Sequence, residues 1–318
     1  MRADAMAAVD SAAAQPALLR RHDTCHEDGV WSVAWTSAGK LVSGSVDETV
    51  KVWDGDLKAE GAPMGGHRLG VISAVPNSTG QWCACSSIDN TIRLWDLESR
   101  QLTRTIDAGP LEAWSLALSS NDAMVATGTH YGAVNVWGVE TGDKMQALKS
   151  PQTKDQFVMS VDVSPDAAKY RVAAGTSAGT VTVYDLETGA VTSSFNEATG
   201  HAMPVRCAKF SHNGELLVTA SDDMSVHVYD LKAQCLAASF TGHTSWVLSV
   251  DCSSDQRHIA SGSSDQSVRI WDLAAKDCSH TFTSHNDQVW SVAYNNDGTC
   301  LAAGCDDGSV EVYDVSSL

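Results

Sequence analysis

The sequence predicts an all-β fold in which one short β-meander is written seven times and the copies close into a seven-bladed β-propeller. A turn residue, usually Asp, stands six residues before a Trp or Tyr in seven places. These places are separated by 42, 42, 47, 45, 42 and 42 residues, the period of four-stranded propeller blades. Short alternating runs of apolar and polar residues, typical of half-buried strands, surround each place.

The repeating unit is clearest at 241–273, where VLSVDC, HIASGS and SVRIW read as strands separated by turn residues. We expect repeats at about 24–63, 64–105, 106–147, 150–194, 199–240, 241–282 and 283–318. The turn residue and its aromatic partner are Asp47 and Trp53, Asp89 and Trp95, Tyr131 and Trp137, Ala178 and Tyr184, Asp223 and Tyr229, Asp265 and Trp271, and Asp307 and Tyr313.

Four residues of a unit can form an Asp-His-Ser-Trp hydrogen-bond network if its strands pair in sequence. Only the first and sixth units contain all four residue types, and the third and fourth have Gly109 and Lys154 in the His register. We assign to this structural network His26, Ser43, Asp47, Trp53, His67, Asp89, Trp95, His201, Thr219, Asp223, His243, Ser261, Asp265, Trp271, His285 and Asp307.

The two ends of the chain predict how the ring closes. Only VSSL follows Tyr313 and Asp314, so the seventh unit lacks an outer strand. Because closed rings avoid exposed sheet edges, we expect the segment 16–22 to supply that strand. The Ala-rich residues 1–15 are expected to be a disordered tail, and 16–318 a single propeller domain.

Composition narrows the function classes. The chain has 21 Lys and Arg against 39 Asp and Glu, a formal net charge of -18, which disfavours direct binding of nucleic acid. Nine scattered cysteines fit free thiols in a reducing compartment. Apolar runs are shorter than the roughly 20 residues that span a bilayer, so we expect a soluble intracellular protein without membrane contact.

His26, Ser43 and Asp47 have the residue types of a hydrolase triad, but a catalytic Ser needs access to substrate and an oxyanion hole. The repeat places Ser43 in the middle of a strand, so we expect a structural network and no catalytic residues. Cys83 and Cys85 would face one side of a strand without further ligands at metal-site spacing. We therefore expect neither a metal nor another cofactor.

A candidate partner-binding site lies at the start of each unit's first strand. Propeller geometry would gather seven such positions around one mouth of the central channel, and their aromatic, Met and Arg residues are types enriched at binding hot spots. The alternative is that some of these rings fill space between blades. The peptide-docking surface we predict contains Trp31, Trp114, Phe157, Met159, Arg206, Asp222, Trp246, Leu248, Trp290 and Asp306, with Ile72 completing the ring.

Several stretches are more particular than a generic WD repeat, among them HEDGVWSVAW at 26–35, ATGTHYGAVNVWGVETG at 126–142 and HNDQVWSVAYNNDG at 285–298. Through them the chain resembles the Ski8-type WD-repeat proteins, subunits of the superkiller complex. The resemblance implies a monomeric, non-enzymatic propeller within a hetero-complex, with a tetratricopeptide-repeat scaffold and a helicase that feeds mRNA to the exosome for 3′ to 5′ decay. It also implies a place beside the subunits of the polymerase-associated factor complex of transcription elongation, and both cytoplasmic and nuclear localisation.

Two other interpretations stay open. A structural WD-repeat subunit of another large assembly, for example a ciliary or cytoskeletal one, could use the same docking face. A chromatin peptide reader would need an acidic or aromatic pocket, which Trp31 and Asp306 could supply.

Overall fold

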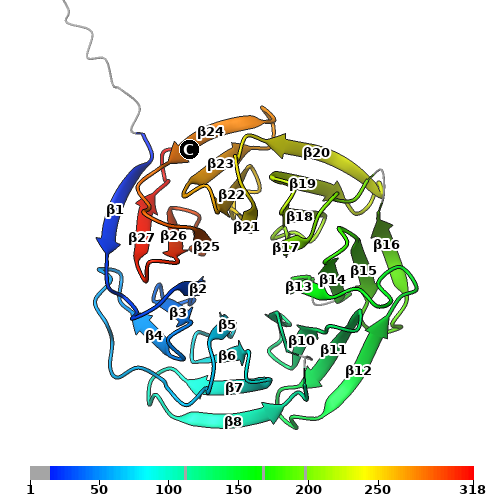
Figure 1. The fold of residues 1–318 in the computed structure, drawn as a ribbon, viewed down its shortest axis with the longest axis horizontal. Helices are drawn as coiled ribbons and strands as arrows, with labels where there is room; N and C mark the ends of the chain where they lie inside the picture. Colours follow the sequence, from blue (N-terminus) through cyan, green and yellow to red (C-terminus); the bar gives the residue numbers. More distant parts are fainter. Residues whose placement is uncertain (1–14, 111–112, 167–168, 197–198) are drawn as a thin grey trace, which may run out of the picture.

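The computed structural model describes residues 15–110, 113–166, 169–196 and 199–318, so the tail predicted at 1–15 lies outside the described residues except for Gln15. Seven antiparallel sheets stand around a central channel (Figure 1). The predicted all-β, seven-bladed propeller is confirmed. Within the described residues, no helix has the length and apolar character needed to cross a membrane.

Each blade is a meander whose first strand lines the channel (Figure 1). The first blade contains β2 (Val30–Trp35), β3 (Leu41–Ser45) and β4 (Val50–Trp53); the second contains β5 (Val71–Pro76), β6 (Trp82–Ser87), β7 (Thr91–Asp96) and β8 (Leu102–Asp107); the third contains β9 (Leu116–Leu118), β10 (Met124–Gly128), β11 (Ala133–Gly138) and β12 (Lys144–Lys149). The fourth contains β13 (Val158–Val163), β14 (Arg171–Thr176), β15 (Val181–Asp185) and β16 (Val191–Phe195); the fifth contains β17 (Val205–Phe210), β18 (Leu216–Ser221), β19 (Ser225–Asp230) and β20 (Cys235–Thr241). The sixth contains β21 (Val247–Cys252), β22 (His258–Ser263), β23 (Val268–Asp272) and β24 (Asp277–Phe282), and the seventh contains β25 (Val289–Tyr294), β26 (Cys300–Cys305) and β27 (Val310–Asp314).

The seventh blade is completed from the other end of the chain, as predicted. Strand β1 (Ala17–His22) pairs antiparallel with β27, in register from Ala17 opposite Asp314 to His22 opposite Val310. The sheet order is β1, β27, β26, β25, so the first strand of the chain is the outermost strand of the last blade (Figure 1).

The first blade departs from the four-stranded pattern that the repeat period predicts. Its sheet has three strands, and the segment after β4 only touches the outer edge, through isolated bridges Val50 to Met64 and Trp53 to Ala59. Three residue steps on β4 face five on the other segment, so the two bridges do not continue into a regular fourth ladder.

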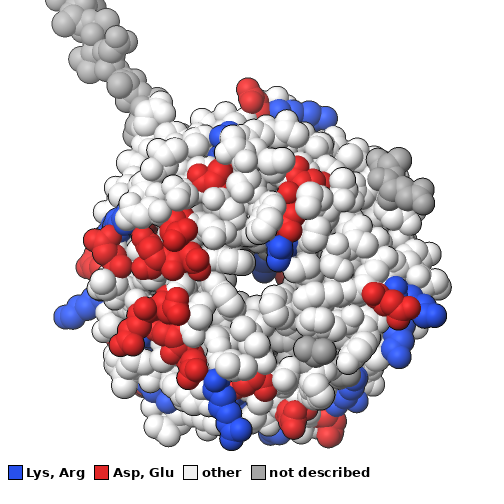
Figure 2. All heavy atoms as spheres, in the orientation of Figure 1, with Lys and Arg blue, Asp and Glu red and all other residues white. Residues whose placement is uncertain are grey.

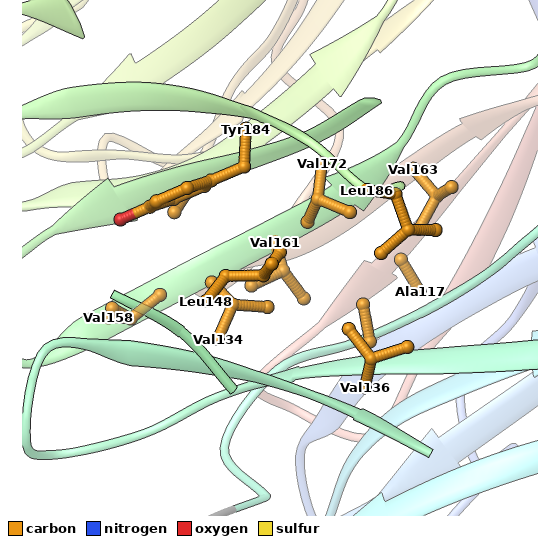
Figure 3. Packing of buried hydrophobic residues seen from close by; sticks show 12 residues of the cluster. Ala117, Val134, Val136, Leu148, Val158, Val161, Val163, Val172, Tyr184 and Leu186 are labelled. Carbon is orange, nitrogen blue, oxygen red and sulfur yellow. The ribbon is translucent and has the colours of Figure 1, made fainter. Parts of the chain in front are cut away.

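The core lies between neighbouring blades. Between the third and fourth, apolar side chains of β11 and β12 meet those of β13, β14 and β15, and Val134, Leu148, Val172 and Tyr184 have at most 1% exposure (Figure 3). Complete burial of each aliphatic side chain contributes about 1.5–3 kcal/mol. Because each sheet covers the next, the second strands of the blades, such as β3 and β22, are buried on both faces.

A belt of small polar side chains ties the inner strands to one another. On the first strand of each blade, or just before it, one position beside the channel is a Ser in six blades and a Cys in the fifth: Ser32, Ser73, Ser115, Ser160, Cys207, Ser249 and Ser291. Backbone N–H groups of the adjacent blade donate to these hydroxyls, as from Val33 to Ser291 at 3.0 Å and from Ala74 to Ser32 at 3.0 Å. This belt joins neighbouring blades by bonds that run around the channel, and it was not predicted from the sequence.

Candidate functional site

The seven positions predicted to encircle one end of the channel do meet there. One cavity of about 530 Å³ is lined by all of them, with the serine belt below. We call this end of the channel, together with the side chains around it, the mouth. The ring consists of Trp31, Ile72, Trp114, Met159, Arg206, Leu248 and Trp290.

One side of the mouth is aromatic and acidic. The rings of Trp31 and Trp290 lie 5.6 Å apart, and the Trp290 indole N–H donates to the Asp306 carboxylate at 2.9 Å. Burial raises the pKa of Asp306, and the carboxylates of Asp287 and Asp28 raise it further, against the lowering effect of the Trp290 hydrogen bond. The same negative charges that raise the pKa of Asp306 would attract a cation to this side of the mouth.

The acidic character extends over the seventh and first blades, which meet where the two ends of the chain close the ring. In Figure 2, Asp and Glu side chains gather on the half of the face above β25 to β27 and β2 to β4. Asp28 is exposed, and Asp287 and Asp306 are half-buried. This half of the face therefore presents negative potential beside aromatic surface.

At the fifth and sixth blades, the mouth has a fixed cation and an exposed ring. Arg206 donates to both oxygens of Asp222, at 2.8 and 2.7 Å, and Asp222 is only 4% exposed. The guanidinium also lies over the ring of Trp246, 5.6 Å from its centre, and Trp246 is 47% exposed. Because its charge is already satisfied, Arg206 positions Trp246 as an apolar platform.

The third side is a small aromatic cluster. Trp114 meets the ring of Phe157 edge-on at 5.1 Å, and Phe157 stacks on His130 at 3.7 Å. Met159 lines the cavity beside them, whereas Leu248 is 4% exposed and serves as a wall of the cavity. Among the side chains of the predicted docking surface, the buried Leu248 therefore fills space between blades, whereas the exposed Trp246 does not.

The predicted Asp-His-Ser-Trp hydrogen-bond network is complete in the first and sixth blades. His26 Nδ1–H donates to Asp47 at 2.8 Å, because a carboxylate can only accept, which leaves Nε2 to accept from Ser43 at 2.7 Å. Trp53 then donates to the Ser43 oxygen at 2.8 Å. The sixth blade repeats these bonds at 2.8, 2.7 and 2.8 Å among His243, Asp265, Ser261 and Trp271.

The network sets the protonation states of its members. Burial alone would raise the pKa of Asp47, but hydrogen bonds from His26 and Thr49 outweigh it and hold that pKa below the usual range. Burial lowers the pKa of His26. In the fifth blade, His201 bonds Asp223 at 2.8 Å and Thr219 at 2.7 Å, so Thr replaces Ser without loss of the bond.

The second blade has a broken network. Cys85 stands where the others have Ser or Thr, and its Sγ lies 3.7 Å from that of Cys83. His67 approaches Asp89 at 3.3 Å, yet neither His67 Nε2 nor Trp95 Nε1 has a hydrogen-bond partner among the described residues. Two buried polar nitrogens therefore go unsatisfied.

The assignment of Asp307 as the partner of His285 is wrong. Asp307 accepts from Ser309, and no His285 bond to it is present among the described residues; His285 Nε2 instead bonds the Tyr313 hydroxyl at 2.8 Å. Tyr313 has replaced Trp, and its hydroxyl donates to the buried carboxylate of Glu311 at 2.5 Å. A carboxylate two residues before the aromatic has taken over the network.

The Glu311 carboxylate is fully buried and joins the chain's two ends. Arg21 Nη1 on β1 donates to it at 2.8 Å, and the Ser284 hydroxyl also donates to it. We call this set, Arg21 with Glu311, Ser284 and Tyr313, the Arg21 latch. A Glu inside an otherwise apolar strand, VEVYD, was the available signal in the sequence.

The two units without the His keep only part of the network. In the third, Trp137 donates to Thr127 at 3.0 Å. In the fourth, Thr153, one position before Lys154, contacts the aromatic residue of the unit. The Thr153 hydroxyl lies 3.2 Å from that of Tyr184 and donates to the Gly132 carbonyl at 2.7 Å. Lys154 itself is exposed.

The triad-like residues are closed to substrate. Ser43 has 0% exposure and His26 5%. Among the described residues, no group of three or more His, Cys, Asp and Glu side chains is arranged to hold a metal ion.

Comparison with known proteins agrees with this architecture. The model of the WD domain, G-beta repeat, matches residues 18–54, 234–272 and 276–314, and that of the nucleolar protein 10-like N-terminal domain matches 68–246. The chain belongs to the WD-repeat family of β-propeller proteins.

Two relatives match over most of their length. WD repeat-containing protein SL1-17 of Schistosoma mansoni is 40% identical over 215 residues, which cover 65% of this chain and 68% of that protein. WD repeat-containing protein VIP3 of Arabidopsis thaliana is 35% identical over 260 residues, 76% of this chain and 79% of that protein. Superkiller complex protein 8 of Dictyostelium discoideum is 36% identical over 89 residues, 27% of this chain and 29% of that protein.

Proposed function

We propose that the chain is a scaffold subunit that grips short segments of partner proteins at the mouth. The observation that carries this proposal is the convergence of Trp31, Trp114 and Trp290 with Met159 on one open cavity. Large side chains in a partly desolvated pocket are where binding energy concentrates in protein interfaces. The half-exposed ring of Trp246 extends the same surface outward.

The charges of the mouth indicate the kind of segment it accepts. The cluster of Asp306, Asp287 and Asp28 beside the Trp31 and Trp290 rings favours a cationic side chain, by charge and by cation–π attraction. Trp246 favours an apolar one, because the nearby charge of Arg206 is neutralised by Asp222. A segment with a basic and an apolar residue fits both.

We assign the chain to a superkiller-type assembly that acts in exosome-linked 3′ to 5′ mRNA decay. The partial match to Superkiller complex protein 8 and the sequence resemblance support this assignment. The partners would be a tetratricopeptide-repeat scaffold and a helicase, and a second role beside polymerase-associated factor subunits would place the chain in both cytoplasm and nucleus.

The proposed role is non-enzymatic. The buried His26 and Ser43 are hydrogen-bonded to each other, and they also bond Asp47 and Trp53, respectively. These bonds support a structural role for the set. Recurrence of the same bonds in the sixth blade supports the same conclusion, because a catalytic site is not duplicated at each repeat.

The test is purification of the tagged chain from native lysate with quantitative mass spectrometry of the bound proteins. We expect Trp246→Ala and the double variant Trp114→Ala/Trp290→Ala to lose the partners, since a hot-spot residue contributes about 2 kcal/mol or more. The control is Met145→Ala, an exposed apolar residue near the start of β12, away from the mouth. Recovery of the full partner set with a folded mouth variant would end the proposal, and recovery of ciliary or cytoskeletal proteins would reassign the assembly.

A chromatin peptide reader is a second candidate, favoured by one observation. Trp31 and Trp290 lie 5.6 Å apart beside Asp306, an aromatic and acidic pocket of the kind that holds a basic or methylated side chain. Binding of histone-tail peptides that is lost in Asp306→Asn would favour the reader over the decay subunit.

A further inference from the structure

A second groove lies on the outer part of the third blade, away from the mouth. It has a volume of about 640 Å³ and is bordered by the β10–β11 turn, by β11 and β12, and by the loop that leads to β13. We call it the lysine groove, after Lys144, Lys149 and Lys154, which line it together with Tyr131 and Pro151. Its size is in the range of binding pockets for small ligands or a few side chains.

The groove exists because this blade lacks the usual network. Tyr131 occupies the turn position that has Asp in five other blades, and no His is present to hold that turn inward. Its ring is accordingly 62% exposed. The loop on the other side is fixed: Thr153 donates to the Gly132 carbonyl at 2.7 Å, and a Cβ at Gly132 would lie 1.8 Å from the Thr153 carbonyl oxygen.

The charge of the groove is opposite to that of the chain. Three lysines line it against a single carboxylate, that of Asp155, although the whole chain has a formal net charge of -18. Lys144 lies over the Trp137 ring, 5.5 Å from its centre. Lys149 and Lys154 are exposed and make no ion pair within the described parts of the chain.

The position of the groove separates it from the acidic half of the face. In Figure 2, Lys and Arg side chains lie along the rim near β12 with some Asp and Glu side chains among them, across the disc from the larger acidic group above β25 to β27. An anionic ligand is repelled by that acidic half and attracted to this rim. The exposed Tyr131 ring and Pro151 add apolar surface between the charges.

We propose that the lysine groove is a second docking site, for an acidic segment of a partner protein that contains an aromatic or other large apolar residue. The carboxylates pair with Lys149 and Lys154, and the apolar side chain packs on Tyr131 and Pro151. A peptide fits better than nucleic acid, because a phosphate backbone long enough to bind through the groove would run on toward the acidic parts of this chain. The site is independent of the mouth, so either can fail without the other.

The test begins with selection of peptides on the full chain from a displayed library of random 12-residue peptides. The selected peptides are then synthesised with a fluorophore, and their Kd is measured by fluorescence anisotropy. We expect a class rich in Asp and Glu around one aromatic residue. Its Kd should rise about tenfold or more in Lys149→Glu/Lys154→Glu, because two attractions become repulsions, and it should stay unchanged in the mouth variant Trp246→Ala.

The matched control is Lys58→Glu/Lys232→Glu, which makes the same change of charge at two exposed lysines in other blades. Circular dichroism and urea midpoints check folding, and Lys149→Met/Lys154→Met provides a second variant without reversed charge. Equal weakening by the control pair would show non-specific attraction and overturn the site, as would the absence of an acidic class. A single-stranded RNA of equal charge that binds with the same dependence on Lys149 and Lys154 would overturn the peptide as the occupant.

Discussion

Replacing Arg21 by Met should destabilise the fold far more than the same change at its neighbour Arg20. Arg21 is the cation of the latch, 2.8 Å from a Glu311 carboxylate that has no exposure to solvent. Met retains the aliphatic stem and removes the guanidinium, with its charge and its hydrogen bonds, among them the one to the Ser284 carbonyl at 2.7 Å. Glu311 would keep its bonds from Tyr313 and Ser284 but would lose the group that compensates its charge.

The expected loss follows from burial. Removing one partner of a buried ion pair costs about 3–5 kcal/mol, because the remaining charge stays desolvated. Arg20 also forms an ion pair, with Asp56, but those side chains are 40% and 78% exposed, so Arg20→Met should cost about 0–1 kcal/mol. The two arginines lie side by side on β1, which makes them a matched pair.

Urea unfolding followed by circular dichroism measures both free energies of unfolding. The double variant Arg21→Met/Glu311→Gln should recover a large part of the loss, since an amide in place of the carboxylate leaves no buried charge. Equal midpoints for Arg21→Met and Arg20→Met would refute the latch. Failure of Glu311→Gln to rescue Arg21→Met would show that the loss comes from packing of β1 instead.

Three further predictions concern closure, the broken network and pH. Deleting residues 1–22 removes β1 and should lower the melting temperature sharply, whereas deleting 1–14 should not; equal melting temperatures would contradict closure by this strand. Cys85→Ser should stabilise the chain by about 1 kcal/mol or more, because the hydroxyl satisfies the buried nitrogens of Trp95 and His67; Cys83→Ser, which adds a hydroxyl to the apolar core, is the control and should destabilise it in the same urea experiment. Burial, aided by His201, lowers the pKa of His227 to about 4. The unfolded chain takes up this proton near pH 6.5 and the folded chain only near pH 4, so stability should fall as the pH drops through that window. His227→Gln should have a flatter dependence of urea midpoint on pH between 7 and 5, and an unchanged slope would contradict the assignment.

The sequence was sufficient for the parts of the fold that repeat. The pair of turn residue and aromatic recurs seven times at intervals of 42 to 47 residues, which predicts the number of blades. The missing outer strand after Tyr313 pointed to 16–22 as its replacement. The seven equivalent positions at the start of each first strand had to meet at the mouth once a closed seven-bladed ring was predicted. These inferences succeed because each depends on a local pattern that recurs.

What escaped prediction depends on single substitutions compensated from far along the chain. Glu311 is satisfied by Arg21, 290 residues earlier, and by Ser284, so the alignment that paired His285 with Asp307 could not reveal it. In the first blade, the extra residues around 60–63 remove a strand without changing the spacing of the turn residues. Repetition predicts the average blade, and contacts specific to one blade decide the exceptions.

The seam between the seventh and first blades joins the latch to the mouth, yet the two should respond separately to mutation. The latch lies at the outermost strand pair, β1 and β27, whereas Trp31 and Trp290 stand on the innermost strands β2 and β25. Those inner strands have their own link, since Ser291 accepts from the Val33 N–H at 3.0 Å. At temperatures where it is still folded, the Arg21→Met variant should therefore bind peptides at the mouth with the wild-type Kd, measured by fluorescence anisotropy. A large loss of affinity in the folded variant would show instead that the outer latch sets the geometry of the mouth.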